Sequence, residues 1–202
     1  MAAIMFVIGL TGSIGMGKTT TAQLFAEKNV PVHDADAIVH LLYEGEAVAV
    51  IEAAFPGTTK NYKVDRSALG QRIVGNADAL RRLEAIVHPL VRHAETQFLE
   101  KALNSGAKVA LLDIPLLYET NGDQRVDAVV VVTAPAEVQR ARVLERGIDS
   151  AQLEALLARQ LPDAEKRRRA DFVVDTSRGI ESARAQVQDI LSAVAKMPKR
   201  RK

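Results

Sequence analysis

The 202-residue chain contains no cysteine and no tryptophan, and aromatic residues make up only 4% of it. Without cysteine it has no disulfide bond, no thiolate metal ligand and no thiol nucleophile. The chain also lacks the roughly 18 consecutive apolar residues that a membrane-spanning helix needs. Its longest apolar run near the N-terminus, Ile4 to Leu10, lacks the basic flank and cleavage site of a signal peptide. These absences favour a cytoplasmic protein that is neither exported nor embedded in a membrane.

The rest of the composition is that of an ordinary globular domain, with 48% hydrophobic and 26% charged residues. Disordered and collagen-like chains are therefore excluded. A domain usually contains about 100–200 residues, so the length predicts one domain over residues 1–195 with room for an insertion.

Positive charge is concentrated at the C-terminus. Residues 196–202 carry five of the 27 Lys and Arg and no acidic residue, which leaves the preceding 195 residues with a net charge of −3. A basic tail either is a solvated terminus or holds nucleic acid or another acidic surface. We expect the solvated terminus, so nucleic acid is an unlikely partner.

Short apolar runs alternate with helical patterns along most of the chain. Strands that are apolar throughout and separated by helices predict a three-layer α/β fold, in which helices cover both faces of a parallel sheet of about five strands. The predicted strands are 5–10, 30–32, 109–112, 128–133 and 172–175, and the main helices are 18–28, 35–43, 136–145 and 181–194.

Two segments interrupt this alternation. Residues 44–105 contain polar turns and helical patterns without a convincing central strand, so we expect a mostly helical insertion there. Residues 137–168 are rich in arginine, which suits a lid over a phosphorylated ligand, because guanidinium groups bind phosphate oxygens in pairs.

The strongest motif is Gly12-Ser-Ile-Gly-Met-Gly-Lys-Thr19, which satisfies G-x-x-x-x-G-K-[ST] between a predicted strand and a predicted helix. Glycines let backbone N–H groups surround a phosphate, and the helix N-terminus adds partial positive charge. Lys18 would contact the β- and γ-phosphates, and the Thr19 hydroxyl would bind Mg²⁺. The predicted nucleotide-binding residues are Gly12, Gly15, Met16, Gly17, Lys18, Thr19 and Thr20.

A phosphate-binding loop identifies a nucleotide but not a reaction. The chain has neither the D-x-x-G nor the N-K-x-D segment of GTPase switches, and it is short for a motor or transporter ATPase. A small-molecule kinase fits best.

Two carboxylates follow the second predicted strand, at the sheet edge where such folds bind ligands. A kinase acting on an alcohol needs a carboxylate that accepts the hydroxyl proton, and Asp34 and Asp36 are both candidates. An aspartate there also caps helices, so we expect one structural and one chemical role. His40 lies one turn after Asp36 and either helps to hold the acceptor or is a surface residue.

Taken together, five segments resemble the dephospho-CoA kinase family, over residues 4 to 195. They are Gly9-Leu-Thr-Gly-Ser-Ile-Gly-Met-Gly-Lys-Thr-Thr20, Val32-His-Asp-Ala-Asp-Ala-Ile-Val-His40, Ile86-Val-His-Pro-Leu-Val-Arg92, Leu112-Asp-Ile-Pro-Leu-Leu-Tyr-Glu119 and Arg167-Arg-Arg-Ala-Asp-Phe-Val-Val-Asp175.

The resemblance implies a kinase fold with a helical acceptor-binding insertion and a lid. It implies that ATP phosphorylates the ribose 3′-hydroxyl of dephospho-CoA, the last step of coenzyme A synthesis, with Asp36 as the base. Thr176 departs from the asparagine of the family pattern, which leaves an adenine contact at that position open.

Further site residues are expected in the insertion, after the third strand and in the lid. His88 and Arg92 would contact the acceptor, unless they only belong to a surface helix. Asp113 would reach the Mg²⁺ shell, and Leu116 would line the acceptor site or pack in the core. Among the lid arginines we favour Arg142 and Arg146 as catalytic contacts, the latter next to a hinge at Gly147, over Arg140 and Arg159.

The predicted partners are the two small-molecule substrates, ATP and dephospho-CoA, and a monomer is expected. Two other functions remain open at this point. One is a nucleoside or nucleotide-monophosphate kinase with the same fold, and the other is a nucleotide-binding regulator that uses the basic tail.

Overall fold

The computed structural model describes residues 5–199, which form two compact units. The first, here called the sheet unit, comprises the described residues up to His33 and from Ala102 onward. The second, the helical unit, comprises Asp34–Lys101. Of the predicted basic tail, residues 200–202 lie outside the described part of the chain.

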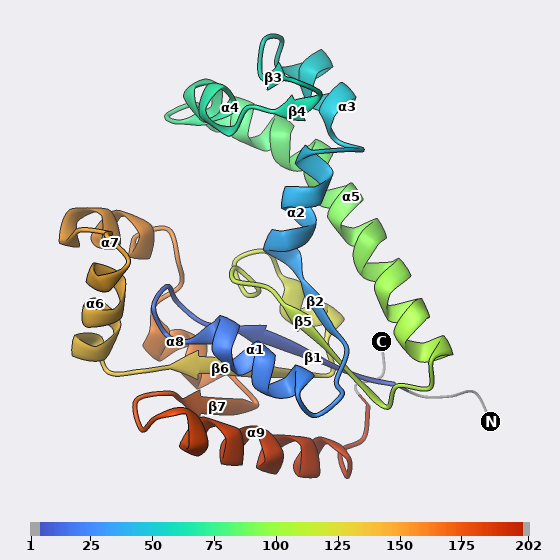
Figure 1. Ribbon diagram of the computed structural model, residues 1–202, viewed down its shortest axis with the longest axis vertical. Coiled ribbons are helices and arrows are strands. Elements are labelled where there is room, and N and C mark those ends of the chain that lie inside the picture. Colours follow the sequence, from blue (N-terminus) through green and yellow to red (C-terminus); the bar gives the residue numbers. More distant parts are fainter. Residues whose placement is uncertain (1–4, 200–202) are drawn as a thin grey trace. The chain divides into compact units, whose positions relative to one another are not determined.

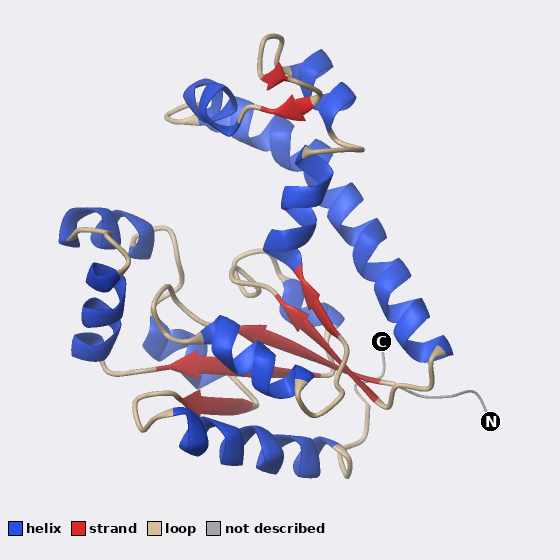
Figure 2. Cartoon of the chain, in the orientation of Figure 1, coloured by secondary structure: helices blue, strands red, loops and turns tan. Residues whose placement is uncertain are grey.

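The sheet unit contains a five-stranded sheet in the order β2-β5-β1-β6-β7, with β1 at its centre (Figures 1 and 2). β1 pairs in parallel with β5 and β6, and β6 pairs in parallel with β7. From β1 the chain continues to β2 on one side of the sheet, and after β5 it crosses to β6 on the other side of β1. The loop that follows β1 therefore emerges at the change of direction where such folds bind ligands. The strands are β1 (Phe6–Thr11), β2 (Val32–Asp34), β5 (Val109–Asp113), β6 (Ala128–Thr133) and β7 (Phe172–Asp175).

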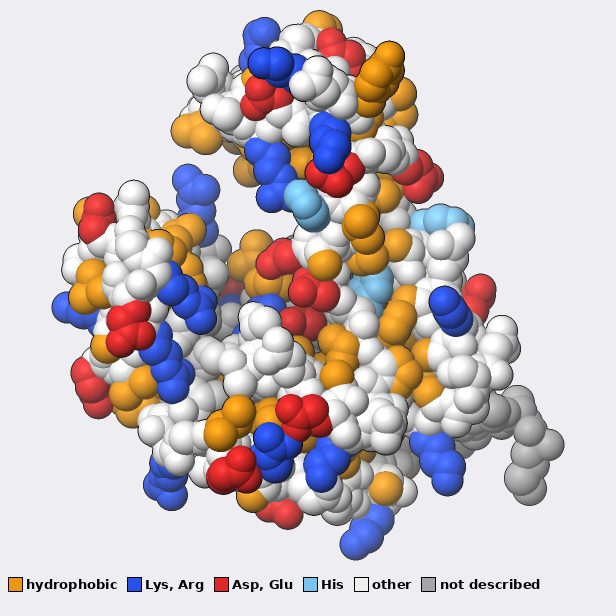
Figure 3. All heavy atoms as spheres, viewed as in Figure 1, with side chains coloured by type: hydrophobic (Ala, Val, Ile, Leu, Met, Phe, Trp, Pro, Cys, Tyr) orange, Lys and Arg blue, Asp and Glu red, His pale blue; other side chains and the backbone are white. Residues whose placement is uncertain are grey.

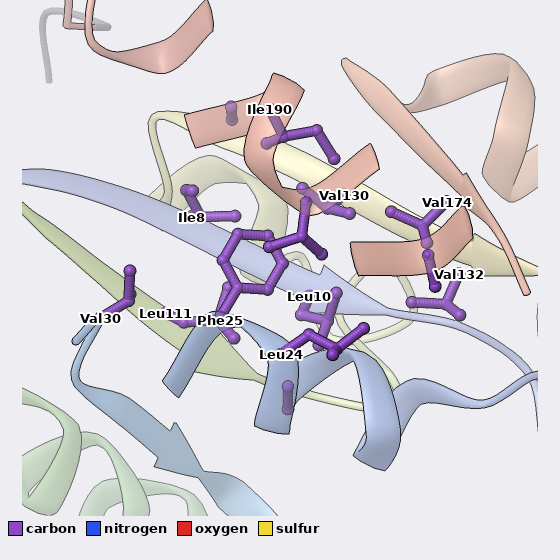
Figure 4. Close-up of a cluster of buried hydrophobic side chains, with 14 of the residues drawn as sticks. Ile8, Leu10, Leu24, Phe25, Val30, Leu111, Val130, Val132, Val174 and Ile190 are labelled. Carbon is purple, nitrogen blue, oxygen red and sulfur yellow. The ribbon is translucent and has the colours of Figure 1, made fainter. Parts of the chain in front are cut away.

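One face of this sheet is covered by α1 (Lys18–Ala26) and α9 (Ile180–Val194). Phe25 of α1 is fully buried and lies among strand side chains and Ile190 of α9 (Figure 4). Alternate strand residues such as Ile8 and Leu10 point into this layer, as the two-residue period of a strand requires.

The opposite face is covered by α8 (Asp163–Arg169), which contacts β6, and by the segment that leads to the 3-10 helix η1 (Gly122–Arg125). Gly9 faces this layer, since a Cβ there would lie 2.9 Å from Leu117 Cδ2 and 3.1 Å from Val126 Cγ1. The three-layer α/β prediction is therefore confirmed. The remaining helices of the sheet unit are α6 (Ala136–Glu145) and α7 (Ser150–Leu157).

The helical unit has its own core, in which Ile51, Leu69 and Leu83 are buried together. It also contains a two-stranded antiparallel pair, β3 with β4, which the sequence did not predict because each strand has only two residues. Its elements are α2 (Ala35–Tyr43), α3 (Val48–Ala54), β3 (Thr59–Lys60), β4 (Lys63–Val64), α4 (Arg66–Ile73) and most of α5 (Ala77–Asn104).

The predicted elements agree closely with these bounds. The strands at 128–133 and 172–175 and the helices at 35–43 and 136–145 are confirmed at both ends. The second strand, predicted at 30–32, lies two residues later, and the compact helical unit begins at 34 instead of 44 because α2 follows β2 directly. No helix within residues 5–199 is long and apolar enough to cross a membrane.

Candidate functional site

The segment Gly12–Thr19, called the phosphate loop from here on, connects β1 to α1 in the sheet unit. Gly17 caps α1 with φ 91°, and Gly15 has φ 77°, both in the left-handed region that favours glycine. A Cβ at Gly12 would lie 2.7 Å from the carbonyl oxygen of Val132. The glycines of the motif are therefore required by the backbone path.

The first turn of α1 is suited to an anion. The first four amides of any helix lack a helical partner, and they carry partial positive charge. Within the described residues, these amides donate no hydrogen bond to an N-cap side chain, because the N-cap is Gly17, and the first turn contains no acidic residue. They therefore remain able to bind an anion. Thr19 and Thr20 are exposed there.

Lys18 and Asp113 form an ion pair, with Lys18 Nζ 2.6 Å from Asp113 Oδ1. Asp113, at the end of β5, is nearly buried, whereas the Lys18 side chain is 16% exposed. An ammonium has three donors, so Lys18 keeps the capacity to contact a phosphate while it bonds to Asp113. The carboxylate thus sets the position of the lysine beside the phosphate loop.

Thr176, directly after β7, is hydrogen-bonded to the phosphate loop. Its hydroxyl donates to the carbonyl of Met16 at 2.8 Å and accepts from Arg142 Nη1 at 2.8 Å. Arg142 Nη2 also donates to the carbonyl of Thr176 at 2.8 Å. The departure from the family pattern at Thr176 therefore supplies a hydroxyl that links the loop to α6.

Two further contacts anchor the same loop. Gln139, buried on α6, donates from Nε2 to the carbonyl of Ile14 at 2.7 Å. The side chain of Met16 is 3% exposed, and its sulfur lies 3.1 Å from the amide nitrogen of Ala134. Met16 therefore belongs to the loop through its backbone, while its side chain packs in the core.

A buried ion pair lies beside β5. The Lys166 side chain on α8 is 0% exposed, and its Nζ lies 3.0 Å from Glu119 Oε1 and 3.4 Å from the carbonyl of Pro115. The Pro115 carbonyl also accepts from the Thr11 hydroxyl at 2.8 Å, directly before the phosphate loop. This network joins α8, the segment after β5 and the end of β1.

Glu119 additionally accepts from the backbone amide of Leu161 at 2.7 Å. Burial raises the pKa of this carboxyl, but the Leu161 amide and the Lys166 ammonium outweigh it, so the pKa of Glu119 lies below its usual value. The carboxylate is thereby held ionised as the partner of Lys166.

The oxygen donors around the phosphate loop fit magnesium. Mg²⁺ prefers oxygen ligands and is usually held by one or two carboxylates together with substrate phosphates and waters. The exposed Thr19 hydroxyl and the Asp113 carboxylate are donors of this kind. Within residues 5–199 no cluster of three or more His, Asp or Glu could hold a metal by itself.

In the helical unit, the two aspartates have different surroundings. Asp34 is the N-cap of α2, where its Oδ1 accepts from the amide of Ala37 at 3.0 Å. Asp36 is exposed in the first turn of α2 and lines a pocket of ≈ 400 Å³. The capping role expected of one aspartate therefore falls on Asp34.

His40 is an exposed surface residue of α2 whose Nδ1 lies 3.2 Å from Arg66 Nη2. Arg66 lines the same pocket as Asp36, although the sequence did not single it out. His88 and Arg92 are exposed on α5, which continues through Pro89. These two residues lie outside the lining of that pocket.

The remaining predicted residues of the sheet unit are more dispersed. Arg146 is exposed at the C-cap of α6, and Leu116 is 39% exposed after β5. Arg140 on α6 pairs with Glu154 on α7 at 3.5 Å, and basic and acidic side chains are interspersed over these helices (Figure 3). Of the two favoured lid arginines, Arg142 is bonded to Gly15 of the phosphate loop and to Thr176.

Sequence reasoning missed Gln139 and the pair of Lys166 with Glu119, and it singled out Thr176 for a possible adenine contact but not for its support of the phosphate loop. One signal was present, because Gln139 and Arg142 are spaced by three residues and so share a face of α6. The partners of the other three residues are far away in the sequence, and only the fold brings them together.

Comparison with known proteins identifies the family of the chain. The family model described as dephospho-CoA kinase matches residues 6–182. A protein of Rhodopseudomonas palustris strain BisB18 named dephospho-CoA kinase is 65% identical over 198 residues, covering 98% of this chain and 100% of the relative. A protein of that name from Nitrobacter winogradskyi is 62% identical with the same coverage.

Solved structures show the same fold. The crystal structure of TT1252 from Thermus thermophilus is similar with a TM-score of 0.87 and 30% identity, covering 96% of this chain and 100% of that one. Dephospho-CoA kinase from Campylobacter jejuni gives a TM-score of 0.64 at 22% identity, covering 93% and 96%. At that lower identity the likeness supports the fold alone.

Proposed function

The chain belongs to the dephospho-CoA kinase family, and on this premise we propose that it transfers the γ-phosphoryl group of ATP to the ribose 3′-hydroxyl of dephospho-CoA. ATP binding is supported by the phosphate loop, beside which Lys18 is held by an ion pair of 2.6 Å between its Nζ and Asp113 Oδ1. Phosphoryl transfer to an acceptor is supported by Asp36, an exposed carboxylate that lines a pocket.

The donor phosphates would bind along the amides of the phosphate loop and the first turn of α1. Lys18 would neutralise charge on the β- and γ-phosphates, while Thr19 and Asp113 would hold Mg²⁺, directly or through water. Magnesium supplies positive charge that stabilises the transferred phosphoryl group. Gln139 and Thr176 contribute by fixing the loop that presents these donors.

Asp36 would accept the proton of the 3′-hydroxyl. The acceptor oxygen forms a bond to the γ-phosphorus, and the bond from that phosphorus to the bridging oxygen of ADP breaks, with its electron pair leaving on ADP. Such a base aims the hydroxyl and contributes roughly 10²–10⁴-fold in rate. Asp34, which also caps α2, would contact the acceptor. The exposed residues His40, His88 and Arg92 would contact it as well.

We propose that residues 137–168, from α6 to α8, form a lid. Gly147, between α6 and α7, has φ 78° and open space around its Cβ position, which suits a hinge. Arg142 and Arg146 would contact phosphate after closure, which excludes water from the reaction. Hydrogen exchange over residues 140–168 should slow when ATP and acceptor bind together, and equal exchange with and without ligands would contradict a lid there.

Product analysis tests the proposed function. Dephospho-CoA, AMP, shikimate and pantothenate are offered separately with Mg-ATP, and the products are identified by mass spectrometry. The account predicts one added phosphate on dephospho-CoA. A phosphate added to AMP but not to dephospho-CoA would favour the nucleotide-monophosphate kinase alternative. The cytoplasmic location and monomeric state expected from the sequence stay predictions.

A further inference from the structure

The proposed lid rejoins the rest of the sheet unit at a short segment that leads from α7 into α8. This segment, 161–163, is called the lid root from here on. The amide of Leu161 donates to Glu119 Oε1 at 2.7 Å, and Asp163 accepts from the Thr133 hydroxyl at 3.0 Å. Glu119 follows β5 and Thr133 ends β6, so the lid root is bonded to two different parts of the sheet unit. The proposed function gives neither contact a role.

Glu119 connects the lid root to the phosphate loop. Its Oε1 also lies 3.0 Å from Lys166 Nζ, and the Lys166 side chain is 0% exposed. The same Nζ donates to the carbonyl of Pro115 at 3.4 Å, and that carbonyl accepts from the Thr11 hydroxyl at 2.8 Å. Thr11 is the last residue before the phosphate loop. A continuous series of hydrogen bonds therefore runs from the lid root to the start of the phosphate loop.

Lys166 differs from the basic residues that follow it on α8. Arg167 and Arg168 pair with acidic residues three or four positions away on the same helix, and both are exposed. Such pairs contribute little, because solvent screens them. Lys166 instead pairs with Glu119 on a different segment and is buried, where an ion pair depends strongly on its geometry. This pair is therefore placed to fix two segments relative to each other.

The segment between α6 and the lid root, 147–160, has no comparable bond to the sheet. Its helix α7 is stabilised from within by a capping box between Asp149 and Gln152. The ion pair that joins it to α6, Arg140 with Glu154, measures 3.5 Å and is exposed. Among the described residues, the hydrogen bonds and ion pairs of this segment stay within it or reach α6. The segment can therefore move between its two flanks without breaking a hydrogen bond to the sheet.

We propose that Glu119, together with Thr133, is a positioning residue for phosphoryl transfer, which holds the lid root so that 147–160 closes in one arrangement. The proposal rests on the proposed function. One end of the segment pivots at Gly147, whose φ of 78° suits a hinge, and the other end stays at the lid root. Because the lid root is bonded through Lys166 to the start of the phosphate loop, closure presents the lid arginines to the phosphates in one position. Loss of these contacts should misplace the arginines, and a misplacement of about 1 Å can lower a rate by about 10²-fold.

A pair of variants separates this role from a contribution to stability. Lys166→Met/Glu119→Leu replaces the ion pair by apolar side chains, which should recover part of the stability that Lys166→Met loses. The double variant still lacks an acceptor for the Leu161 amide. We therefore expect its kcat to stay about tenfold or more below wild type, although its urea midpoint rises above that of Lys166→Met. A kcat that returns to the wild-type value together with the midpoint would overturn the proposal.

Thr133→Val tests the second contact of the lid root in a protein whose buried ion pair is intact. Valine keeps the shape of threonine and suits a strand, so the variant should fold. Loss of one hydrogen bond should lower kcat about threefold to tenfold and leave the KM for Mg-ATP within about twofold of wild type. Thr96→Val, which removes an exposed hydroxyl bonded within α5, is the matched control and should keep both constants. A wild-type kcat in Thr133→Val would contradict the proposal.

Hydrogen exchange reports on the lid root directly. Wild type and the variants are compared without ligand, with Mg²⁺ and a non-hydrolysable ATP analogue, and with dephospho-CoA added to these. In wild type we expect the slowing to be concentrated in 147–160, with little change over 163–168. Thr133→Val and the double variant should lose this slowing and keep that of the phosphate loop, and equal slowing of 147–160 in all proteins would overturn the proposal. If wild type fails to phosphorylate dephospho-CoA, the proposed function fails, and exchange with the analogue alone still tests Glu119.

Discussion

In the proposed function, the phosphate loop of the sheet unit and the pocket of the helical unit would bind their ligands with different parts of the chain. The phosphate loop uses the backbone of eight consecutive residues. Side chains from distant elements, among them Gln139 and Thr176, hold that backbone in place. The pocket uses side chains from three helices, and its charged groups, Asp36 and Arg66, are exposed.

The difference follows from what each ligand requires. A phosphate is bound by amides, which every residue has, so its site depends on a fixed backbone path and on glycines that permit it. An organic acceptor is distinguished by its shape and by a few polar contacts. Its site therefore depends on the identity of the side chains that line it, and these can differ between proteins that share one backbone fold. Substitutions should accordingly affect ATP through the sheet unit and the acceptor through the helical unit.

The largest expected effect in the sheet unit is that of Lys18→Ala. Loss of one preorganised charge at a transferring group typically lowers the rate by about 10²–10³. We expect a kcat lower by this factor in folded protein. Lys28→Ala, at an exposed position after α1, is the control and should retain wild-type activity. If Lys18→Ala keeps an activity within tenfold of wild type, the proposed role of the phosphate loop in the reaction is wrong.

Lys166→Met tests whether the buried ion pair supports the sheet unit. Removing one partner of a buried pair costs about 3–5 kcal/mol of stability, and the lower end applies because Glu119 is partly exposed. We expect this loss in urea unfolding, and we expect the double variant Lys166→Met/Glu119→Leu to recover part of it. A single variant as stable as wild type would mean that the pair is not structural.

The same pair predicts a pH dependence. The pKa of Glu119 is lower in the folded protein than in the unfolded chain, so its contribution is fully present above the unfolded value of about 4.3. The contribution is lost as the pH falls through the lower folded value. Glu119→Gln should therefore show a shallower loss of unfolding free energy below about pH 4 than wild type, and identical acid limbs would contradict this linkage.

Thr176→Val should have a smaller effect that is specific to the nucleotide. It removes the hydroxyl that donates to Met16 and accepts from Arg142. Each such hydrogen bond contributes about 0.5–1.5 kcal/mol, so we expect a KM for Mg-ATP raised about tenfold. Thr176→Ser restores the hydroxyl and should restore the KM. If Thr176→Val changes the KM for the acceptor and leaves the KM for ATP unchanged, the assignment of ATP to the sheet unit and of the acceptor to the helical unit is wrong.

The smallest expected effect is that of Arg140→Gln. Both side chains of the Arg140–Glu154 pair are more than half exposed, and such surface pairs contribute at most about 1 kcal/mol. We expect a change in unfolding free energy below about 0.5 kcal/mol and unchanged kinetics. A loss of activity comparable to that of Arg142→Gln would show that the lid uses a different arginine.

The sequence could predict those features that depend on residues close together in the chain. The phosphate loop was recognisable because its glycines and Lys18 lie within eight consecutive residues. The longer strands were recognisable because they are apolar runs, whereas β2, with the sequence Val-His-Asp, was predicted two residues too early. Asp36 and Asp34 were found for the same reason, directly after a strand. Which of the two caps α2 was left open, since either aspartate fits that position.

Residues whose roles depend on distant partners were not predictable. Tyr43 and Leu83 meet in one pocket although 40 positions separate them, and neither belongs to a local motif. Lys166 reads as part of a solvated basic run before Arg167, yet it is fully buried against Glu119. The pair β3–β4 is too short to produce a strand pattern. These features arise from tertiary packing, which overrides local preference.

The central claim is that the acceptor hydroxyl is activated by Asp36 of the helical unit while ATP is bound by the sheet unit. Asp36→Asn tests it most directly, because asparagine keeps the shape and removes the charge that takes the proton. The single-turnover rate and the Kd for Mg-ATP are measured for this variant, with Asp34→Asn as the control, which is expected to act through folding or metal placement and not through proton transfer. The account predicts a rate lower by roughly 10²–10⁴ with ATP affinity within a few-fold of wild type. A normal rate in Asp36→Asn together with a lost rate in Asp34→Asn would contradict it.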